Sequence, residues 1–383
     1  MWMRLLDICD FQGGSQPPKD EWLFEKQEGY IRMLQIRDFT QSEKVVPEYV
    51  KISKSTKICQ ADDILIARYG ASIGKILTGL SGAYNVAIMR AIPDTHMLQK
   101  KYLYYYLKSP YFQTAILNVG SRAAQAGFNK EDLSKLEIKC PLLSEQDSII
   151  DILQKVESII GKRKKELIFL GELVKARFVE MFGTLHDNEN GFDIVTIEDV
   201  CSLIKDGTHQ TPQYTEDKKE GYKFLSSKDV MSQKVDWTNI KYIPAELHEK
   251  LYATIKPQRN DILMSKNGVN YGVAAVNDTD EVFDIYVSLA LLRPKKIIDP
   301  VFLKCVINNP ETKWQFDSSI KGIGVPNLHL GEIKKTRMFL PPIELQNQFA
   351  DFVRAIDKSK VAIKKSLDET QILFDSLMQK YFG

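Results

Sequence analysis

No group of residues in this sequence has the types and spacing of a catalytic or metal-binding site. The segment 70–75 resembles a phosphate-binding loop, but its glycines are one residue too close and Ile76 replaces the magnesium-binding serine or threonine. No Gly-x-Gly-x-x-Gly motif for a dinucleotide or methyl-donor cofactor is present. The five histidines are His96, His186, His209, His248 and His329. Since they lack metal-ligand spacing, we expect no catalytic residue, metal site or cofactor in this chain.

Two segments rich in glycine, proline and hydrogen-bonding side chains predict exposed loops, at residues 11–19 and 205–214. Their donors and acceptors suit base edges or phosphates of a nucleic acid. The candidate contacts are Gln12, Ser15, Gln16, Lys19, Thr208, His209 and Gln210. An ordinary solvated turn would have the same composition, so this pattern alone leaves both interpretations open.

A second pair of segments follows an Asp-Ile-Leu run, at residues 67–75 and 265–272. Each combines a cation with two glycines, which permit close backbone approach to a sugar-phosphate strand. The candidate contacts are Arg68, Tyr69, Ser72, Lys75, Lys266, Asn267, Asn270 and Tyr271. We expect Lys266 to bind a phosphate, although the glycines would also suit a hairpin without any ligand.

A third pair of segments lies at residues 120–129 and 321–327. Asn129 and Asn327 are expected to cap the helical turns that follow them, which is a structural role. The candidate nucleic-acid contacts here are Arg122, Gln125 and Lys321.

The second half of the chain repeats the first. Residues 5–9 correspond to residues 197–201, and Asp-Ile-Leu recurs at residues 63–65 and 261–263. The offset is 200 residues at the ends of the copies, where Met181-Phe182-Gly183 answers Tyr381-Phe382-Gly383. Two copies of a unit of about 190 residues therefore fill the chain, and each copy is long enough to have its own core.

The composition of each copy changes once, from a first part rich in short β-type runs to a last part with a helical pattern. Its first part alternates short β-branched and aromatic runs with Gly, Pro and Asn, and it contains one helical stretch, at residues 101–107 or 301–307. Its last 40 or so residues have no proline and show a 3/4 apolar spacing, which over some five heptads is typical of a coiled coil. At ~1.5 Å per residue, each such helix would be roughly 60 Å long.

The fold class is therefore α/β of the α+β kind, with two mixed α/β domains and two long helices that form an antiparallel coiled coil. The expected divisions are a first domain at 1–142, a first helix at 143–183, a second domain at 184–341 and a second helix at 342–383. A helix lying on its own domain is the alternative, but it would overhang a domain whose radius of gyration is only ~14 Å.

Composition adds few constraints. The chain has 383 residues, 44% of them hydrophobic and 27% charged, and a net charge of +2. This small net charge neither indicates nor excludes nucleic-acid binding, because a local basic face is what matters. Five scattered cysteines without a C-x-x-C pair, no membrane-length apolar run and no signal peptide predict a cytoplasmic protein with reduced thiols.

Taken in order, these motifs resemble the specificity subunit of Type I restriction-modification systems over essentially the whole chain. The motifs are the loop 206–212, the Asp-Ile-Leu runs with their glycine turns, the Pro…Gln passages 141–146 and 341–346, and the two helix ends. The first copy departs from the pattern, with Gly-Gly-Ser-Gln-Pro-Pro in place of the histidine-containing loop. Different loops on one frame suggest two target-recognition domains with different sequence preferences.

The resemblance implies a non-catalytic subunit that recognises a bipartite, asymmetric site on double-stranded DNA, in a prokaryotic cytoplasm and in association with the nucleoid. It implies partners as well: modification subunits, expected to be two, which use S-adenosylmethionine to methylate adenine, and restriction subunits that use ATP and magnesium. The main alternative is a protein-protein scaffold in which a coiled coil presents two adaptor domains. An intermediate possibility is a specificity subunit for a simpler methyltransferase-nuclease.

Overall fold

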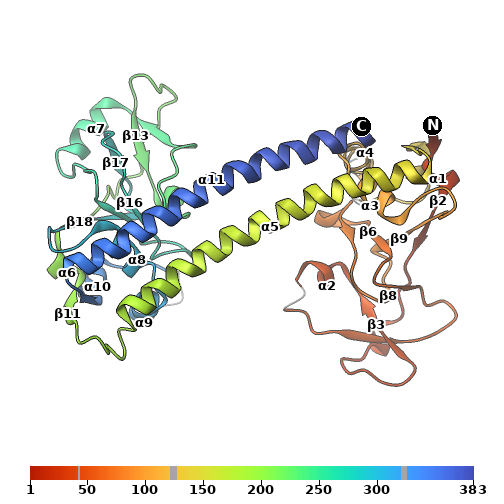
Figure 1. Cartoon of the computed structure of the whole chain (residues 1–383), viewed down its shortest axis with the longest axis horizontal. Helices are drawn as coiled ribbons and strands as arrows, with labels where there is room; N and C mark the ends of the chain where they lie inside the picture. Colours follow the sequence, from red (N-terminus) through yellow and green to blue (C-terminus); the bar gives the residue numbers. More distant parts are fainter. Residues whose placement is uncertain (42–43, 121–126, 321–325) are drawn as a thin grey trace. The chain divides into compact units, whose positions relative to one another are not determined.

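The computed structural model of this chain describes residues 1–41, 44–120, 127–320 and 326–383. Its contacts divide it into two compact units. Unit 1 comprises residues 1–165 and 364–383, and unit 2 comprises residues 166–363. Each unit therefore contains one copy of the repeated domain and parts of both long helices (Figure 1).

Unit 1 contains two four-stranded sheets and a small two-stranded one (Figure 1). The first sheet is antiparallel and has the order β2 (Cys9–Gly13), β9 (Ile88–Pro93), β6 (Ile64–Ala67), β7 (Ile76–Leu77). The second has the order β4 (Glu48–Lys51), β3 (Tyr30–Leu34), β8 (Gly82–Tyr84), β5 (Ile58–Cys59). The third pairs β1 (Trp2–Arg4) with β10 (Glu137–Lys139).

The core of unit 1 is built on α3 (Lys100–Lys108) and the adjacent α4 (Pro110–Gly120). Tyr102, Tyr105 and Tyr106 of α3 are fully buried in the core, which also contains side chains of the first sheet and of both long helices. The hydroxyls of Tyr102 and Tyr106 donate hydrogen bonds to backbone oxygens of β10, so their burial leaves no polar atom unsatisfied. Short helices α1 (Leu5–Ile8) and α2 (Ile36–Thr40) complete the unit.

Unit 2 repeats this arrangement, except that its second sheet has three described strands where that of unit 1 has four. Its sheets have the orders β12 (Cys201–Asp206), β18 (Leu289–Pro294), β15 (Ile262–Ser265), β16 (Ala274–Val276); β14 (Lys241–Ile243), β13 (Tyr222–Leu225), β17 (Phe283–Ile285); and β11 (Asp193–Thr196), β19 (Arg337–Leu340). Its helices are α6 (Ile197–Val200), α7 (Ala245–Tyr252), α8 (Pro300–Ile307), α9 (Pro310–Ser319) and α10 (Leu330–Lys335). The matching strand order confirms the internal repeat and the mixed α/β class.

The two long helices are α5 (Leu143–Phe182) and α11 (Ile343–Phe382). Each begins within two residues of a proline, Pro141 or Pro342. The residue before a proline is biased away from helical backbone angles, so the helix does not extend further toward the N-terminus. One buried glutamine fixes each start. Gln146 accepts a hydrogen bond from the Gln99 backbone N–H, and Gln346 accepts one from the Asp299 backbone N–H, both at 2.9 Å. This contact explains the Pro…Gln passages, because the glutamine attaches the first turn of each helix to the loop before α3 or α8.

The ends of the helices show that they run antiparallel. Phe382, at the end of α11, is buried in unit 1 with its ring centroid 5.0 Å from that of Tyr102. Phe182, at the end of α5, is buried in unit 2 at 4.9 Å from Phe302. Each helix therefore begins on the domain of its own copy and ends in the core of the other, and the Phe-Gly motif marks that final anchor.

All five cysteines are free thiols, and burial raises the pKa of Cys59 to about 11 and of Cys201 to about 12. In the part of the chain that the structure describes, no helix is long and apolar enough to cross a membrane. Within those same residues, no three His, Cys, Asp or Glu side chains are grouped as metal ligands would be.

Candidate nucleic-acid interface

In each unit the loop that follows the first strand of the first sheet is fixed by one glycine. The Gly14 N–H donates to the Ile88 oxygen at 3.0 Å, and the Gly207 N–H donates to the equivalent Leu289 oxygen at 3.3 Å. A Cβ on Gly14 would lie 2.1 Å from the Asn85 oxygen, and one on Gly207 would lie 2.0 Å from the Ile285 oxygen. No side chain fits at either position, so Gly14 and Gly207 are structurally equivalent.

This equivalence aligns the two loops, which differ in sequence. Ser15 of unit 1 follows Gly14 as Thr208 follows Gly207, and both backbone N–H groups donate to the last residue of β8 or β17. Gln16 then corresponds to His209, and both side chains are exposed. The two loops therefore carry different side chains on the same backbone frame.

Arg68 lies where three segments of unit 1 converge. It follows β6, and its guanidinium donates to the Phe128 oxygen at 3.1 Å and to the Val86 oxygen at 3.4 Å. Tyr69, which is 39% exposed, forms a backbone bridge with Gly127. The turn after β6, the turn before β9 and the segment after residue 126 thus meet beside the loop that begins at Gly14.

Lys266 occupies the equivalent position in unit 2. Its backbone N–H donates to the Ser288 oxygen at 3.0 Å, and its own oxygen accepts from Leu328 at 2.8 Å. Asn267 forms a backbone bridge with Asn327, and its buried Oδ1 has no hydrogen-bond partner among the described residues. The three candidate segments that the sequence indicates are therefore brought together in both units.

The structure corrects the expected role of Asn327, which pairs with Asn267 and does not cap a helix: His329 precedes α10. Asn129 does act as a cap, because its Oδ1 accepts from the Asp132 backbone N–H at 3.0 Å. The difference arises because Asn327 is drawn into the backbone ladder beside the turn that follows β15.

Two candidate contacts have roles inside unit 2. Lys266 is only 4% exposed, and its amino group pairs with Asp206 at 2.8 Å. It is therefore not the open phosphate contact that the sequence suggested. Tyr271 is 8% exposed, its hydroxyl donates to Asp317, and the Lys313 amino group lies 3.7 Å from its ring centroid. The pairing with a partner 60 residues away, which the sequence does not show, buries the lysine.

Two candidates in unit 1 also help to hold the loop. Gln12 Oε1 accepts from the Tyr84 hydroxyl at 3.0 Å, and Ser15 Oγ accepts from the Lys57 backbone N–H at 3.3 Å. Near them, hydrogen bonding to the Lys130 amino group lowers the pKa of Asp10. These contacts connect β2 to both the second sheet and the segment after residue 126.

The remaining candidates differ in exposure. The side chains of Gln16, Lys19, Tyr69, Lys75, His209, Gln210 and Asn270 are exposed, and those of Ser72, Thr208 and Asn267 are half-buried. Lys19, Ser72, Lys75 and Asn270 make no side-chain hydrogen bond to the convergent segments in the part of the chain that the structure describes. Arg122, Gln125 and Lys321 lie outside the described residues.

Sequence reasoning did not single out Asp206 or the turns before β9 and β18. In the sequence, Asp206 is marked only by its place before a loop glycine. Tyr286 forms a bridge with Thr208, and a pairing of residues so far apart in the chain is set by the fold and not by any local motif. Burial raises the pKa of Asp284, whose carboxylate lies 2.7 Å from His248 Nδ1 deeper in unit 2. The ring of Tyr222 stacks on that histidine at 3.6 Å, so this pair is part of the core.

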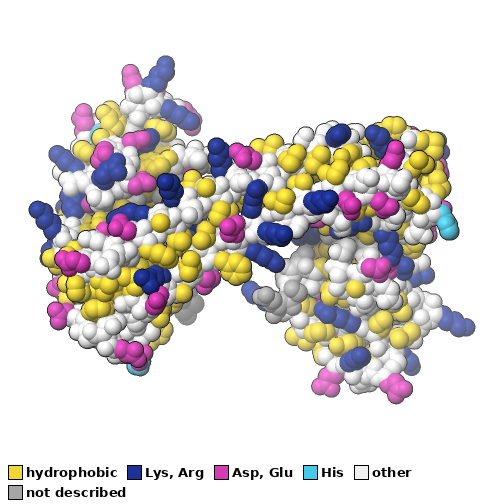
Figure 2. All heavy atoms as spheres, viewed as in Figure 1, with side chains coloured by type: hydrophobic (Ala, Val, Ile, Leu, Met, Phe, Trp, Pro, Cys, Tyr) yellow, Lys and Arg dark blue, Asp and Glu magenta, His cyan; other side chains and the backbone are white. Residues whose placement is uncertain are grey.

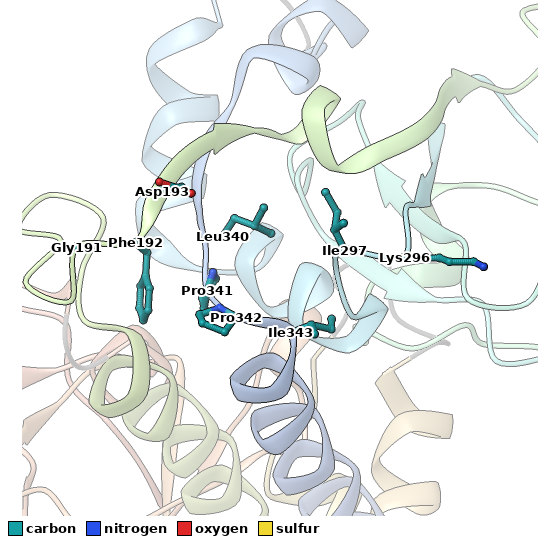
Figure 3. Close-up of a pocket in the computed structure, with 9 residues that line it drawn as sticks. All are labelled: Gly191, Phe192, Asp193, Lys296, Ile297, Leu340, Pro341, Pro342 and Ile343. Carbon is teal, nitrogen blue, oxygen red and sulfur yellow. The ribbon is translucent and has the colours of Figure 1, made fainter.

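Unit 2 also contains an open groove of about 570 Å³ that shares no residue with the candidate contacts (Figure 3). It is lined by Gly191, Phe192, Asp193, Lys296, Ile297, Leu340, Pro341, Pro342 and Ile343. The lining comes from the segment entering β11, the turn before α8 and the start of α11. Figure 2 shows Lys and Arg side chains interspersed with Asp and Glu on the face in view, in keeping with the small net charge.

Two copies of one mixed α/β domain, with convergent loops and antiparallel helices, define a protein with two recognition domains. The family model described as "Type I restriction modification DNA specificity domain" matches residues 1–168 and 189–371. The chain belongs to this family, as a DNA specificity subunit with one match in each repeat.

Two curated relatives have the same character. The chain is 22% identical to the Type I restriction enzyme MjaVIII specificity subunit of Methanocaldococcus jannaschii, over 96% of this chain and 88% of the relative. It is also 22% identical to the EcoBI specificity subunit of Escherichia coli, over 80% and 72%.

Solved structures agree in fold. The crystal structure of a Type I restriction-modification S subunit from M. genitalium covers 100% of this chain and 96% of its own, with a TM-score of 0.58 and 14% identity. A chain from a study of complex assembly and conformational transition of the type I R-M system covers 100% and 97%, with a TM-score of 0.54 and 16% identity.

Proposed function

We propose that this chain is a non-catalytic subunit that recognises a bipartite, asymmetric DNA site, with unit 1 recognising one half and unit 2 the other. The observation that carries the proposal is the shared loop frame, in which Gly14 and Gly207 occupy equivalent positions. On that frame the two units carry different hydrogen-bonding side chains, which is what two different half-sites require.

We also propose which subunits the chain assembles with and where in the cell it acts. Modification subunits, two for the two domains, would bind S-adenosylmethionine and methylate adenine, and restriction subunits would use ATP and magnesium. The chain itself would hold none of these cofactors and would act in the prokaryotic cytoplasm, on nucleoid DNA. Family membership supports an assembly with such subunits and with DNA.

The test is co-expression of the chain with its modification subunits, followed by sequencing of methylated adenines across the genome. We expect one motif with two specific halves and a fixed gap. A stable complex that leaves no methylated motif would favour a protein-protein scaffold and contradict the proposal.

Replacing His209 and Gln210 together with alanine should change only the half-site recognised by unit 2. Both side chains are exposed at the loop that Gly207 fixes. A lost base contact weakens discrimination by ~1–3 kcal/mol at one position. Methylome sequencing measures the result, with Glu172→Ala on the exposed face of α5 as the matched control. Relaxation of both half-sites together would show that the units do not recognise DNA separately.

Inserting seven residues into each long helix, after Lys165 and after Ile363, should lengthen the gap between the half-sites by about three base pairs. Seven helical residues add about 10 Å, and DNA rises about 3.4 Å per base pair. Both half-sites should keep their sequences. An altered half-site with an unaltered gap would show that the helices do not set the spacing.

A further inference from the structure

One pair of positions beside the loop frame differs in chemistry between the two units. Gly13 of β2 pairs with Met89, and Asp206 of β12 pairs with Ala290, the equivalent residue of β18. Each is followed directly by the glycine that admits no side chain. Position 13 of unit 1 therefore corresponds to position 206 of unit 2.

The Asp206 carboxylate is held firmly through one oxygen. Its Oδ2 accepts from the buried Lys266 amino group at 2.8 Å and lies 3.3 Å from the exposed His209 Nε2. Its Oδ1 accepts no hydrogen bond from the residues that the structure describes, and the side chain is 20% exposed. Asp206 is also among the residues that line a cavity of about 70 Å³. It is thus a fixed acceptor with one oxygen unused.

Unit 1 has the opposite arrangement. Arg68 makes no ion pair with any carboxylate in the described part of unit 1, and only its Nε and one terminal nitrogen donate, to backbone oxygens. A Cβ on Gly13 would lie 3.2 Å from that guanidinium. Position 13 of unit 1 therefore lies beside Arg68, as Asp206 of unit 2 lies beside Lys266. The Arg68 guanidinium, 5.1 Å from the centroid of the Tyr69 ring, thus has no anionic partner among the described residues, whereas Lys266 is paired with Asp206.

We propose that Asp206 is a specificity-determining residue that accepts a hydrogen bond from the exocyclic amino group of a base in the half-site of unit 2. This inference rests on the proposed function. In the major groove only cytosine N4 and adenine N6 present an amino donor. Lys266 neutralises the carboxylate, which limits its repulsion by phosphates, while the rigid anchor keeps Oδ1 in place.

The same comparison gives unit 1 a different preference at the equivalent point. The open Arg68 guanidinium offers donors to acceptor oxygens and nitrogens, either on a guanine edge or on a phosphate. An acceptor in one unit and a donor in the other make the two half-sites chemically different at the same place. The small change from Gly13 to Asp206 is sufficient for this difference.

The direct test uses Asp206→Asn in the complex with the modification subunits, with binding measured on duplexes that carry every base pair at each half-site position. Asparagine keeps the shape, and with its amide oxygen beside the Lys266 amino group it presents an NH2 donor where Oδ1 accepted, so discrimination for one cytosine or adenine should fall about 10- to 100-fold. Duplexes with the amino group of that cytosine or adenine removed distinguish the two bases. Removal should weaken binding of the unchanged protein and leave Asp206→Asn unaffected.

Gly13→Asp in unit 1 is the reciprocal variant and does not depend on whether Asp206→Asn folds. It should pair with Arg68 and weaken binding through the half-site of unit 1 by about 10-fold or more, with the other half-site unchanged. Unchanged discrimination in Asp206→Asn, or unchanged binding in Gly13→Asp, would overturn the inference. If the unchanged protein shows no sequence preference, the proposed function itself fails.

Discussion

We expect replacement of Phe349 with alanine to lower the free energy of unfolding of unit 2 by about 3–5 kcal/mol. Phe349 is fully buried, and its ring centroid lies 5.5 Å from Phe178, 5.4 Å from Phe182 and 6.4 Å from Phe302. These rings join both long helices to α8. Alanine would remove burial and aromatic contacts at once and leave a cavity that a rigid core fills only partly.

Denaturant unfolding followed by circular dichroism measures this loss. The matched control is Phe169→Ala on α5, because that ring is 69% exposed and its removal should change stability by less than about 0.5 kcal/mol. Phe382→Ala should act on unit 1 as Phe349→Ala does on unit 2, since Phe382 is 1% exposed beside Tyr102. Equal effects of the Phe349 and Phe169 variants would contradict the packing described.

The sequence predicted the long helices well because their signal is local and long. A heptad pattern over some 40 residues, started by proline, places them at 143–183 and 342–383, and the helices observed are Leu143–Phe182 and Ile343–Phe382. Pairing within one chain also follows from the pattern. The reason why the Pro…Gln passage recurs in both copies does not, since the buried contact of Gln346 with Asp299 crosses 47 residues.

The candidate site was predicted in part. Glycine and proline composition located the loops, and the structure brings the three segments together. Composition could not separate Arg68 from Lys266, which look interchangeable as cations beside a glycine turn. Their environments differ because Asp206 faces one and Gly13 the other, and that depends on which residues the strands place side by side. A side chain's exposure is set by such distant contacts, which no local pattern contains.

Gly14→Ala and Gly207→Ala should each abolish recognition of one half-site. A Cβ at these positions would stand 2.1 Å and 2.0 Å from backbone carbonyl oxygens, far inside van der Waals contact. Those oxygens belong to backbone, which cannot rotate away as a flexible side chain would. The loop must therefore shift, and we expect a stability loss of about 1–3 kcal/mol in the unit concerned.

Two other glycines supply the controls. Gly161 of α5 lies in unit 1 and Gly331 of α10 lies in unit 2, and a Cβ on either would meet nothing within 4 Å. Alanine in these helices should be neutral or stabilise by up to about 1 kcal/mol. Any effect of Gly14→Ala or Gly207→Ala beyond that of its control then belongs to the loop and not to glycine removal in general.

Methylome sequencing of cells that carry each variant separates the two units. Gly14→Ala should erase the half recognised by unit 1 and leave the other half as a residual preference, and Gly207→Ala should do the reverse. The reason is that each glycine supports only its own loop, through a hydrogen bond to β9 or β18. If one substitution erased both halves while the mutated chain stayed folded, the two loops would have to work as one site. The equivalence of Gly14 and Gly207 would then reflect shared ancestry of the repeats alone, without separate recognition by each copy.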